Sequence, residues 1–178
     1  MFNKILVALD TGEACTYLFD KSLALAQAAG AKLTLLSVPT SGDDYGLSLP
    51  YAPLITGYPM TVDSATWETY QKEYEEYRAR GREMLSSWCD QATAKGVQAE
   101  FAQVSGEPGR VICDRAKADN ADLIIVGSHG RSGISELLIG SVSSYVMHRA
   151  PCSVLVVRKT ASESLPKEAR ETSQVSTP

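Results

Sequence analysis

Short apolar runs alternate along this chain with longer segments of helical periodicity. KILVAL at residues 4–9 and LTLLSV at residues 33–38 are almost continuous in large aliphatic residues, which is typical of parallel strands covered on both faces. Further buried strands are expected at 123–126 and 153–157, and the alternating segment VQAEFAQV after Gly96 predicts a strand nearer the sheet edge. A chain that alternates strands with helices folds into a mostly parallel sheet with right-handed crossovers.

The helical segments between these strands are amphipathic. One apolar stripe is formed by Leu18, Ser22, Leu25, Ala26 and Ala29, with Gly30 as the helix stop, and a longer one by Tyr70, Tyr74, Tyr77, Gly81, Met84, Leu85 and Trp88. Pro108 predicts the start of a helix over 109–118, and a short helix is expected over 140–149. We therefore expect an α/β fold: an open, doubly wound five-stranded parallel sheet with helices on both faces and, with the first strand central, the order 3-2-1-4-5.

Length, charge and cysteine content narrow the class of protein. A chain of 178 residues is one domain by its length, and its formal net charge of −4 lacks the basic surface that nucleic-acid binding needs. No apolar run is long enough for a membrane span, and the N-terminal MFNKILVALD lacks a signal-peptide pattern, so we expect a cytoplasmic protein. Cys15, Cys89, Cys113 and Cys152 have no metal-ligand spacing and are interpreted as buried apolar residues.

Two segments break the alternating pattern. Residues 39–62 are too long for an ordinary connection and carry several large apolar side chains. Because this insertion leaves the second strand beside the expected site, we hypothesise that it is a lid or a partner-contact segment. Residues 159–178 are polar and poor in large apolar groups, which predicts a disordered tail beyond a domain at 1–158.

The carboxyl ends of three strands bring together groups that suit a nucleotide. The first strand ends at Asp10, the second at Val38, and the fourth runs into Gly127. In a doubly wound sheet these ends converge on one crevice, where ligands bind. A carboxylate can accept hydrogen bonds from ribose, an apolar side chain can face a base, and free backbone N–H groups can hold phosphate.

The glycine spacing after the fourth strand is specific. Gly127 is followed two residues later by Gly130 and nine residues after that by Gly140-Ser141, in IIVGSHGRSGISELLIGSVSSYV. The loop is neither a GxGxxG dinucleotide motif nor a Walker loop, because no Gly-Lys-Ser/Thr follows. Gly140-Ser141 instead begins a helix, whose unpaired N–H groups would face whatever the loop encloses.

This G-x2-G-x9-G-[S/T] pattern resembles the nucleotide-binding signature of the universal stress protein family, in its ATP-binding subgroup. The resemblance extends to KILVALD, to LSV at the second strand end, and to HRAPCSVLVV near the C-terminus, and it covers residues 2–158 outside the insertion. It implies a fold like that of the adenine-nucleotide alpha hydrolases. It also implies an ATP cofactor, with Mg²⁺ as an optional companion ion, and a homodimer paired through the last strand at Val154, Leu155, Val156 and Val157.

The resemblance also assigns binding roles residue by residue. It places adenine against Ala8, Leu9 and Val38, and ribose on Asp10. The loop residues Val126, Gly127, His129, Gly130 and Arg131 would wrap the ribose and phosphates, and Gly140, Ser141, Val142 and Ser143 would hold the phosphates. His129 is expected to act through its backbone rather than as a catalytic group, and Arg131 is either a phosphate partner or a solvated charge.

Three functions stay open at this level. The first is a homodimeric ATP-dependent sensor or switch in the stress response, with an unknown protein partner. The second is a slow ATPase or phosphotransfer protein, which is disfavoured because the site has no P-loop lysine and no evident water-positioning carboxylate. The third is a binder of AMP, ADP or a cyclic nucleotide. An adenylating enzyme of the pyrophosphatase type is set aside because ALDTGEAC lacks its SGGxDS-like loop. No catalytic or metal-binding residue is assigned.

Overall fold

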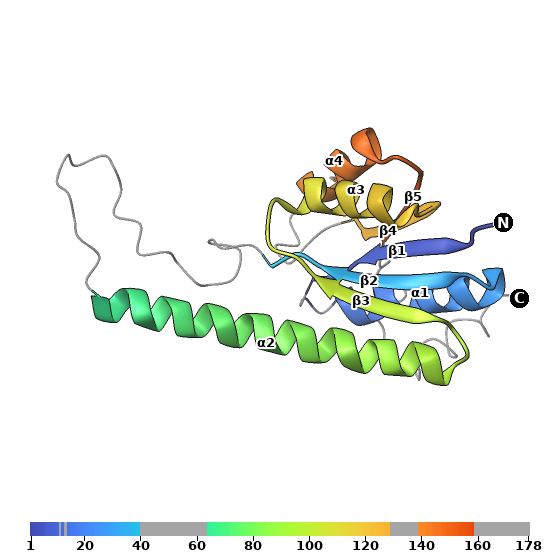
Figure 1. Cartoon of the computed structure of the whole chain (residues 1–178). Helices are drawn as coiled ribbons and strands as arrows, with labels where there is room; N and C mark the ends of the chain where they lie inside the picture. The colour runs from blue at the N-terminus through green and yellow to red at the C-terminus, as the bar shows by residue number, and fades with distance from the viewer. Residues whose placement is uncertain (11, 13, 40–63, 129–138, 159–178) are drawn as a thin grey trace, which may run out of the picture.

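A five-stranded parallel sheet lies between two layers of helices (Figure 1). The computed structural model describes residues 1–158 except 11, 13, 40–63 and 129–138. The strands are β1 (Lys4–Ala8), β2 (Lys32–Ser37), β3 (Ala99–Gln103), β4 (Leu123–Gly127) and β5 (Ser153–Val157). The helices are α1 (Ala14–Ala29), α2 (Ser64–Ala94), α3 (Pro108–Asp119) and α4 (Ser141–Arg149).

The strand order is β3-β2-β1-β4-β5, with every pair parallel, which confirms the fold predicted from the sequence. Val7 in β1 pairs with Leu35 of β2 on one side and with Ile125 of β4 on the other. The segment expected to lie near an edge is indeed the edge strand β3, where Phe101 stays exposed. Because all strands run the same way, their carboxyl ends meet at one edge of the sheet.

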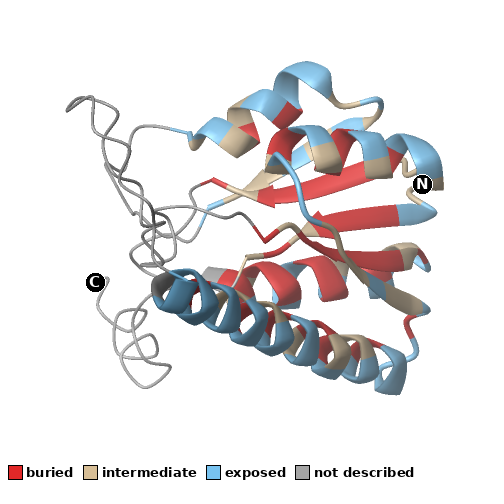
Figure 2. Cartoon of the chain, turned by 60° about the vertical axis from the view of Figure 1, so that its left-hand side comes forward, coloured by how far each residue is buried: buried red, intermediate tan, exposed pale blue. Residues whose placement is uncertain are grey.

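Each face of the sheet has its own hydrophobic core, as the buried inner surfaces in Figure 2 show. On one face, Ile5 and Val7 of β1 pack against α1 and α2, including Phe19 and Trp88, whose rings stack 5.0 Å apart. On the other face, Leu6 packs in the cluster formed with α3 and α4. Alternate residues of the central strands therefore serve opposite cores, which explains their continuous apolar runs.

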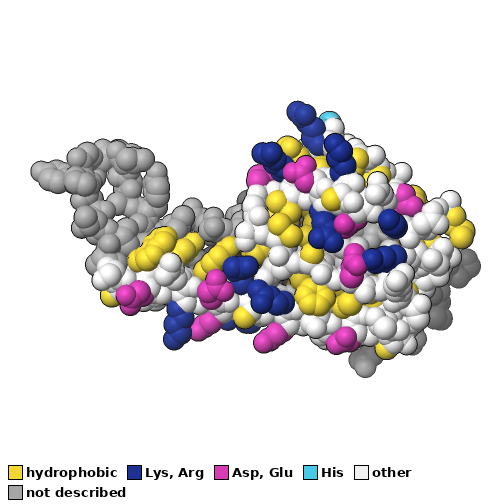
Figure 3. Space-filling view, in the orientation of Figure 1, with side chains coloured by type: hydrophobic (Ala, Val, Ile, Leu, Met, Phe, Trp, Pro, Cys, Tyr) yellow, Lys and Arg dark blue, Asp and Glu magenta, His cyan; other side chains and the backbone are white. Residues whose placement is uncertain are grey.

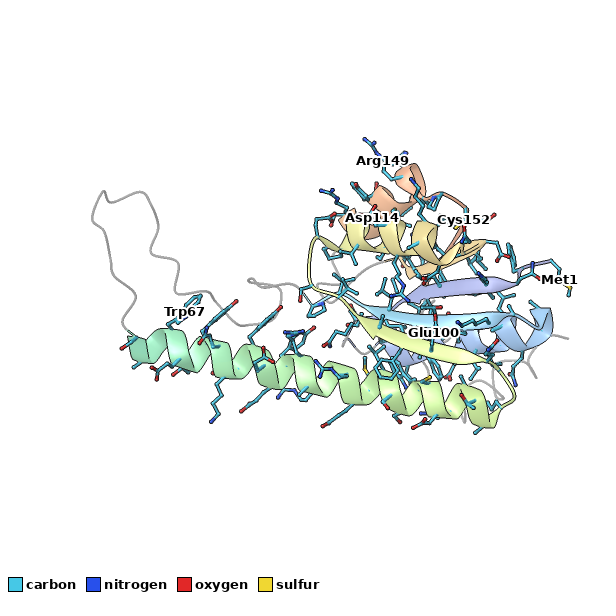
Figure 4. The ribbon with its side chains drawn as sticks, in the orientation of Figure 1. Met1, Trp67, Glu100, Asp114, Arg149 and Cys152 are labelled. Atoms are coloured by element: carbon cyan, nitrogen blue, oxygen red, sulfur yellow. The ribbon has the colours of Figure 1, made fainter. Side chains whose placement is uncertain are left out.

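Local chemistry sets the helix ends. α1 stops at Gly30, whose φ of 64° lies in the left-handed region that favours glycine. α3 begins with Pro108, where the missing N–H costs no intrahelical bond. α2 is 31 residues long, roughly 46 Å at the α-helical rise, and its first turns project past the sheet edge to Trp67 (Figure 4). The aromatic stripe predicted for α2 is buried at Tyr77 and Trp88.

The interpretation of the four cysteines as buried residues is correct for Cys15 and Cys113 and wrong for Cys89 and Cys152, which are half-buried. All four cysteines are free thiols; Cys15 and Cys113 are buried, and burial raises the pKa of Cys89, Cys113 and Cys152.

No helix in the part of the chain that the structure describes could cross a membrane. Basic and acidic side chains are interspersed on the face that Figure 3 shows. The predicted insertion, apart from Pro39, and the predicted tail lie outside the described residues.

Candidate functional site

The candidate site lies where the carboxyl end of β4 meets the first turn of α4. Two hydrogen bonds join these segments, and a third joins the end of β4 to β5. The Gly140 amide donates to the Ser128 carbonyl at 2.7 Å, the Ser143 hydroxyl donates to the Gly127 carbonyl at 2.5 Å, and the Ser128 amide donates to the Val157 carbonyl of β5 at 2.9 Å. The two ends of the glycine-rich loop are thus held together by described residues, with β5 attached to the same point.

A side chain caps the N-terminus of α3, whereas among the described residues no side chain caps the N-terminus of α4. In α3 the Glu107 carboxylate accepts hydrogen bonds from the amides of Gly109 and Arg110, at 3.0 and 2.7 Å. In α4 the N-cap is Gly140, which has no side chain to offer, and the first helical bond runs from the Ser144 amide to the Gly140 carbonyl. The earlier first-turn amides have no acceptor within the helix. The start of α4 therefore offers donors and a partial positive charge to an anion.

Asp10 forms a local turn at the end of β1. Its Oδ1 accepts a hydrogen bond from the Gly12 amide at 2.9 Å, and the side chain is half-buried. An aspartate commonly forms such a turn with the backbone amide two residues further on, without any ligand. It also fixes the carboxylate at the carboxyl edge of the central strand. A fixed carboxylate with a second oxygen is able to accept further hydrogen bonds from a polyol such as ribose.

The apolar candidates divide between the two cores. Ala8, Val38, Val126 and Val142 belong to the cluster on the α3 and α4 side of the sheet, with Ala8 and Val38 half-buried at its margin. These residues from four segments therefore belong to one cluster, in which Val126 is buried. Leu9 differs, because its side chain is buried in the cluster formed with α1 and α2, and its amide donates to the Leu36 carbonyl. Any ligand contact by Leu9 would go through its backbone.

Several predicted site residues fall outside the described part of the chain: His129, Gly130 and Arg131. Among the residues that are described, no three His, Cys, Asp or Glu side chains gather in a way that could hold a metal ion. The sequence reasoning overlooked Ser128, which is buried and bonded on both backbone sides. Ser128 directly follows Gly127 and continues the alternation of the buried residues Ile124 and Val126, and this pattern could have predicted its burial.

Comparison with known proteins decides the family. The model of the Universal stress protein family matches residues 1–158. This chain belongs to the universal stress protein family. Universal stress protein Sll1388 of Synechocystis sp. strain PCC 6803 is 35% identical over 88% of this chain and 98% of its own length. Universal stress protein Slr1101 of the same organism is 42% identical over 56% of this chain and 93% of its own length.

Solved universal stress proteins share the fold. UspA from Lactobacillus plantarum superposes with a TM-score of 0.70 at 23% identity, covering 88% of this chain and 98% of its own. A universal stress protein in complex with cAMP gives a TM-score of 0.60 at 23% identity, over 89% and 98% of the two chains. A family member from Arabidopsis thaliana with AMP bound gives 0.61 at 21% identity, over 94% and 98%.

Proposed function

We propose that this universal stress protein binds ATP at the β4–α4 junction and acts as a homodimeric, nucleotide-dependent sensor or switch in the cytoplasmic stress response. The observation that carries the proposal is the contrast between the two helix N-termini at the carboxyl edge. Glu107 already accepts hydrogen bonds from the first-turn amides of α3, whereas no side chain in the described part of the chain caps α4 at Gly140. An anionic ligand at this edge is accordingly expected at α4.

The other parts of a nucleotide have candidate partners beside the phosphate donors. Ala8 and Val38 are apolar and half-buried and suit a purine face, and Asp10 is a fixed acceptor for ribose hydroxyls. The first-turn amides of Ser141, Val142 and Ser143 would hold the phosphates, with Gly127 and the loop residues His129, Gly130 and Arg131 around them. ATP supplies the phosphate charge for which this donor set is suited.

A second candidate ligand is a mononucleotide. Two structurally similar family members are described with cAMP and with AMP, and the adenine and ribose partners proposed here would serve these ligands equally. The candidates differ in phosphate number. The α4 terminus, which no described side chain caps, favours the ligand that places most negative charge at that position.

The described residues at the junction support binding rather than cleavage. They supply amides and hydroxyls from Gly140 through Ser143, and Asp10 is already assigned to ribose. Phosphoryl transfer needs charge stabilisation together with a group that positions the attacking water. We therefore propose at most weak ATP hydrolysis.

The proposed dimer uses the edge strand β5. Among the described strands this one pairs with β4 alone, and Leu155 is 40% exposed on it. A sheet edge without a further strand presents unpaired backbone groups to a second copy. Because the Val157 carbonyl accepts from Ser128, this edge is bonded to the base of the nucleotide loop. ATP would shift the dimer equilibrium only by binding one arrangement of this junction more tightly than the other.

Two measurements test the ligand assignment. Nucleotide released from the purified full chain by denaturation is identified by mass, and ATP, ADP, AMP and cAMP are titrated calorimetrically into nucleotide-free protein. We expect ATP to be released and to bind at one molecule per chain, more tightly than AMP or cAMP. Tighter binding of AMP or cAMP than of ATP would assign that mononucleotide as the ligand instead. If none of the four nucleotides bound, the proposed nucleotide-binding function would be rejected.

A further inference from the structure

Two carbonyl oxygens at the end of β4 are occupied by donors from the first turn of α4. The Gly127 carbonyl accepts from the Ser143 hydroxyl at 2.5 Å, and the Ser128 carbonyl accepts from the Gly140 amide at 2.7 Å. Resting on the proposed function, we infer that Ser143 is a positioning residue. Its hydroxyl serves phosphate recognition by binding the Gly127 carbonyl, not by touching phosphate.

The physical reason is the sign of the groups that an anion would meet. A carbonyl oxygen carries partial negative charge and repels phosphate, whereas an amide N–H attracts it. At this junction the carbonyls of Gly127 and Ser128 accept hydrogen bonds from internal donors, while the first-turn amides of α4 have no acceptor within the helix and no side-chain cap among the described residues. The two carbonyls, each bound to a donor, therefore repel an anion less, and the first-turn amides attract it.

Burial explains why the Ser143 hydroxyl binds the Gly127 carbonyl and not a ligand. The side chain is 5% exposed and lies in the third position of α4, directed at the last residue of β4. Its single hydroxyl hydrogen is used by the Gly127 carbonyl, so it cannot also be donated to a phosphate oxygen. Removing the hydroxyl leaves a carbonyl without this partner at the loop base and frees the first turn of α4 to shift.

The variants for the test differ by single atoms. Ser143→Ala removes only the hydroxyl oxygen and should fold, which a thermal melt checks. Ser143→Cys keeps a side chain of similar size with a much weaker donor. Ser144→Ala removes the neighbouring hydroxyl in the same turn and is the matched control, because Ser144 contributes its amide to the Gly140 carbonyl.

The readout is the ratio of the affinities for ATP and for adenosine, measured by calorimetry on the full chain. A merely structural role would weaken both ligands together, since adenosine shares the base and ribose contacts. We expect Ser143→Ala to lower the ratio roughly tenfold, as loss of one buried hydrogen bond to a binding group does. Ser143→Cys should fall between Ala and wild type, and Ser144→Ala should leave the ratio unchanged.

The outcomes separate the two proposals. The positioning role would be overturned if wild type bound ATP and Ser143→Ala kept the same ratio of ATP to adenosine affinity, whether both affinities were unchanged or both fell equally. The proposed function would then still stand. Failure of the wild-type chain to bind either ligand would overturn the proposed function, and the positioning role with it.

Discussion

The backbone of Gly109 in α3 lies directly against the ring of Tyr145 in α4. A Cβ placed on Gly109 would stand 2.7 Å from Cδ1, 2.8 Å from Cγ and 3.0 Å from Cβ of Tyr145. No real Cβ tolerates the shorter of these contacts, so glycine is what lets the two helices approach this closely. The position of α4, and with it the proposed phosphate site, depends on this contact.

Gly109→Ala should therefore destabilise the chain and displace α4. We expect a loss of about 1–3 kcal/mol in the free energy of unfolding, as for other overpacked contacts, measured by urea denaturation. In a Tyr145→Ala background the same change should cost less, because both ring contacts are gone. An equal cost in the two backgrounds would mean that the ring is not what resists the methyl group.

Glu100 on β3, marked in Figure 4, gives the fold a pH dependence. The hydrogen bond from Lys32 holds the pKa of the Glu100 carboxyl below its ordinary value, helped by Thr34 and the charge of Arg115. A depressed pKa in the folded state adds stability above the unfolded pKa, and this stability is lost as pH falls through the folded pKa.

Glu100→Gln should accordingly lower stability at pH 7, by less than about 1 kcal/mol because the side chain is 41% exposed. The difference from wild type should shrink as the pH is taken below the ordinary carboxyl pKa of 4.5. Urea denaturation of both proteins at pH 7 and at pH 3–4 measures this difference in stability. A difference that grows on acidification would contradict the predicted stabilisation by ionised Glu100.

Asp10→Asn tests ribose recognition without removing the turn at β1. An asparagine oxygen can still accept from the Gly12 amide, but it is a weaker acceptor for ribose hydroxyls. We expect ATP affinity to fall roughly tenfold, with little change in thermal stability. Wild type should discriminate ATP from its 2′-deoxy or its 3′-deoxy analogue, and the variant should discriminate less. If Asp10→Asn discriminated against both analogues as strongly as wild type does, Asp10 would not bind the ribose.

Val156→Pro tests the proposed dimer edge. The Val157 carbonyl points toward β4, so the backbone groups of Val156, one residue earlier, point away from β4. Proline there removes an outward N–H and is tolerated on an edge strand. We expect a monomer by analytical ultracentrifugation, whereas Val156→Ala, which keeps the amide, stays dimeric. A dimer that survives the proline must use another surface.

The sequence predicted the fold well because its signals are local. Continuous aliphatic runs marked the central strands, Gly30 and Pro108 marked helix ends, and the alternating segment around Phe101 marked the edge. The site was harder, because it depends on which way a side chain faces. Leu9 sits one residue beyond Ala8 and so belongs to the opposite core. Nothing in the spacing showed that the Ser143 hydroxyl is committed to Gly127.

The most direct test of ATP binding at α4 is calorimetric titration of ATP into wild type and Gly140→Asp. The Gly140 backbone, at φ −59° and ψ 154°, has a conformation that L-amino acids adopt without strain. An aspartate N-cap should satisfy a first-turn amide and raise the stability of α4 by a few tenths of a kcal/mol, while its charge repels phosphate. We predict one ATP per wild-type chain and at least roughly tenfold weaker binding in the variant, with an unchanged or higher melting temperature. Equal ATP affinity in both proteins would contradict the account.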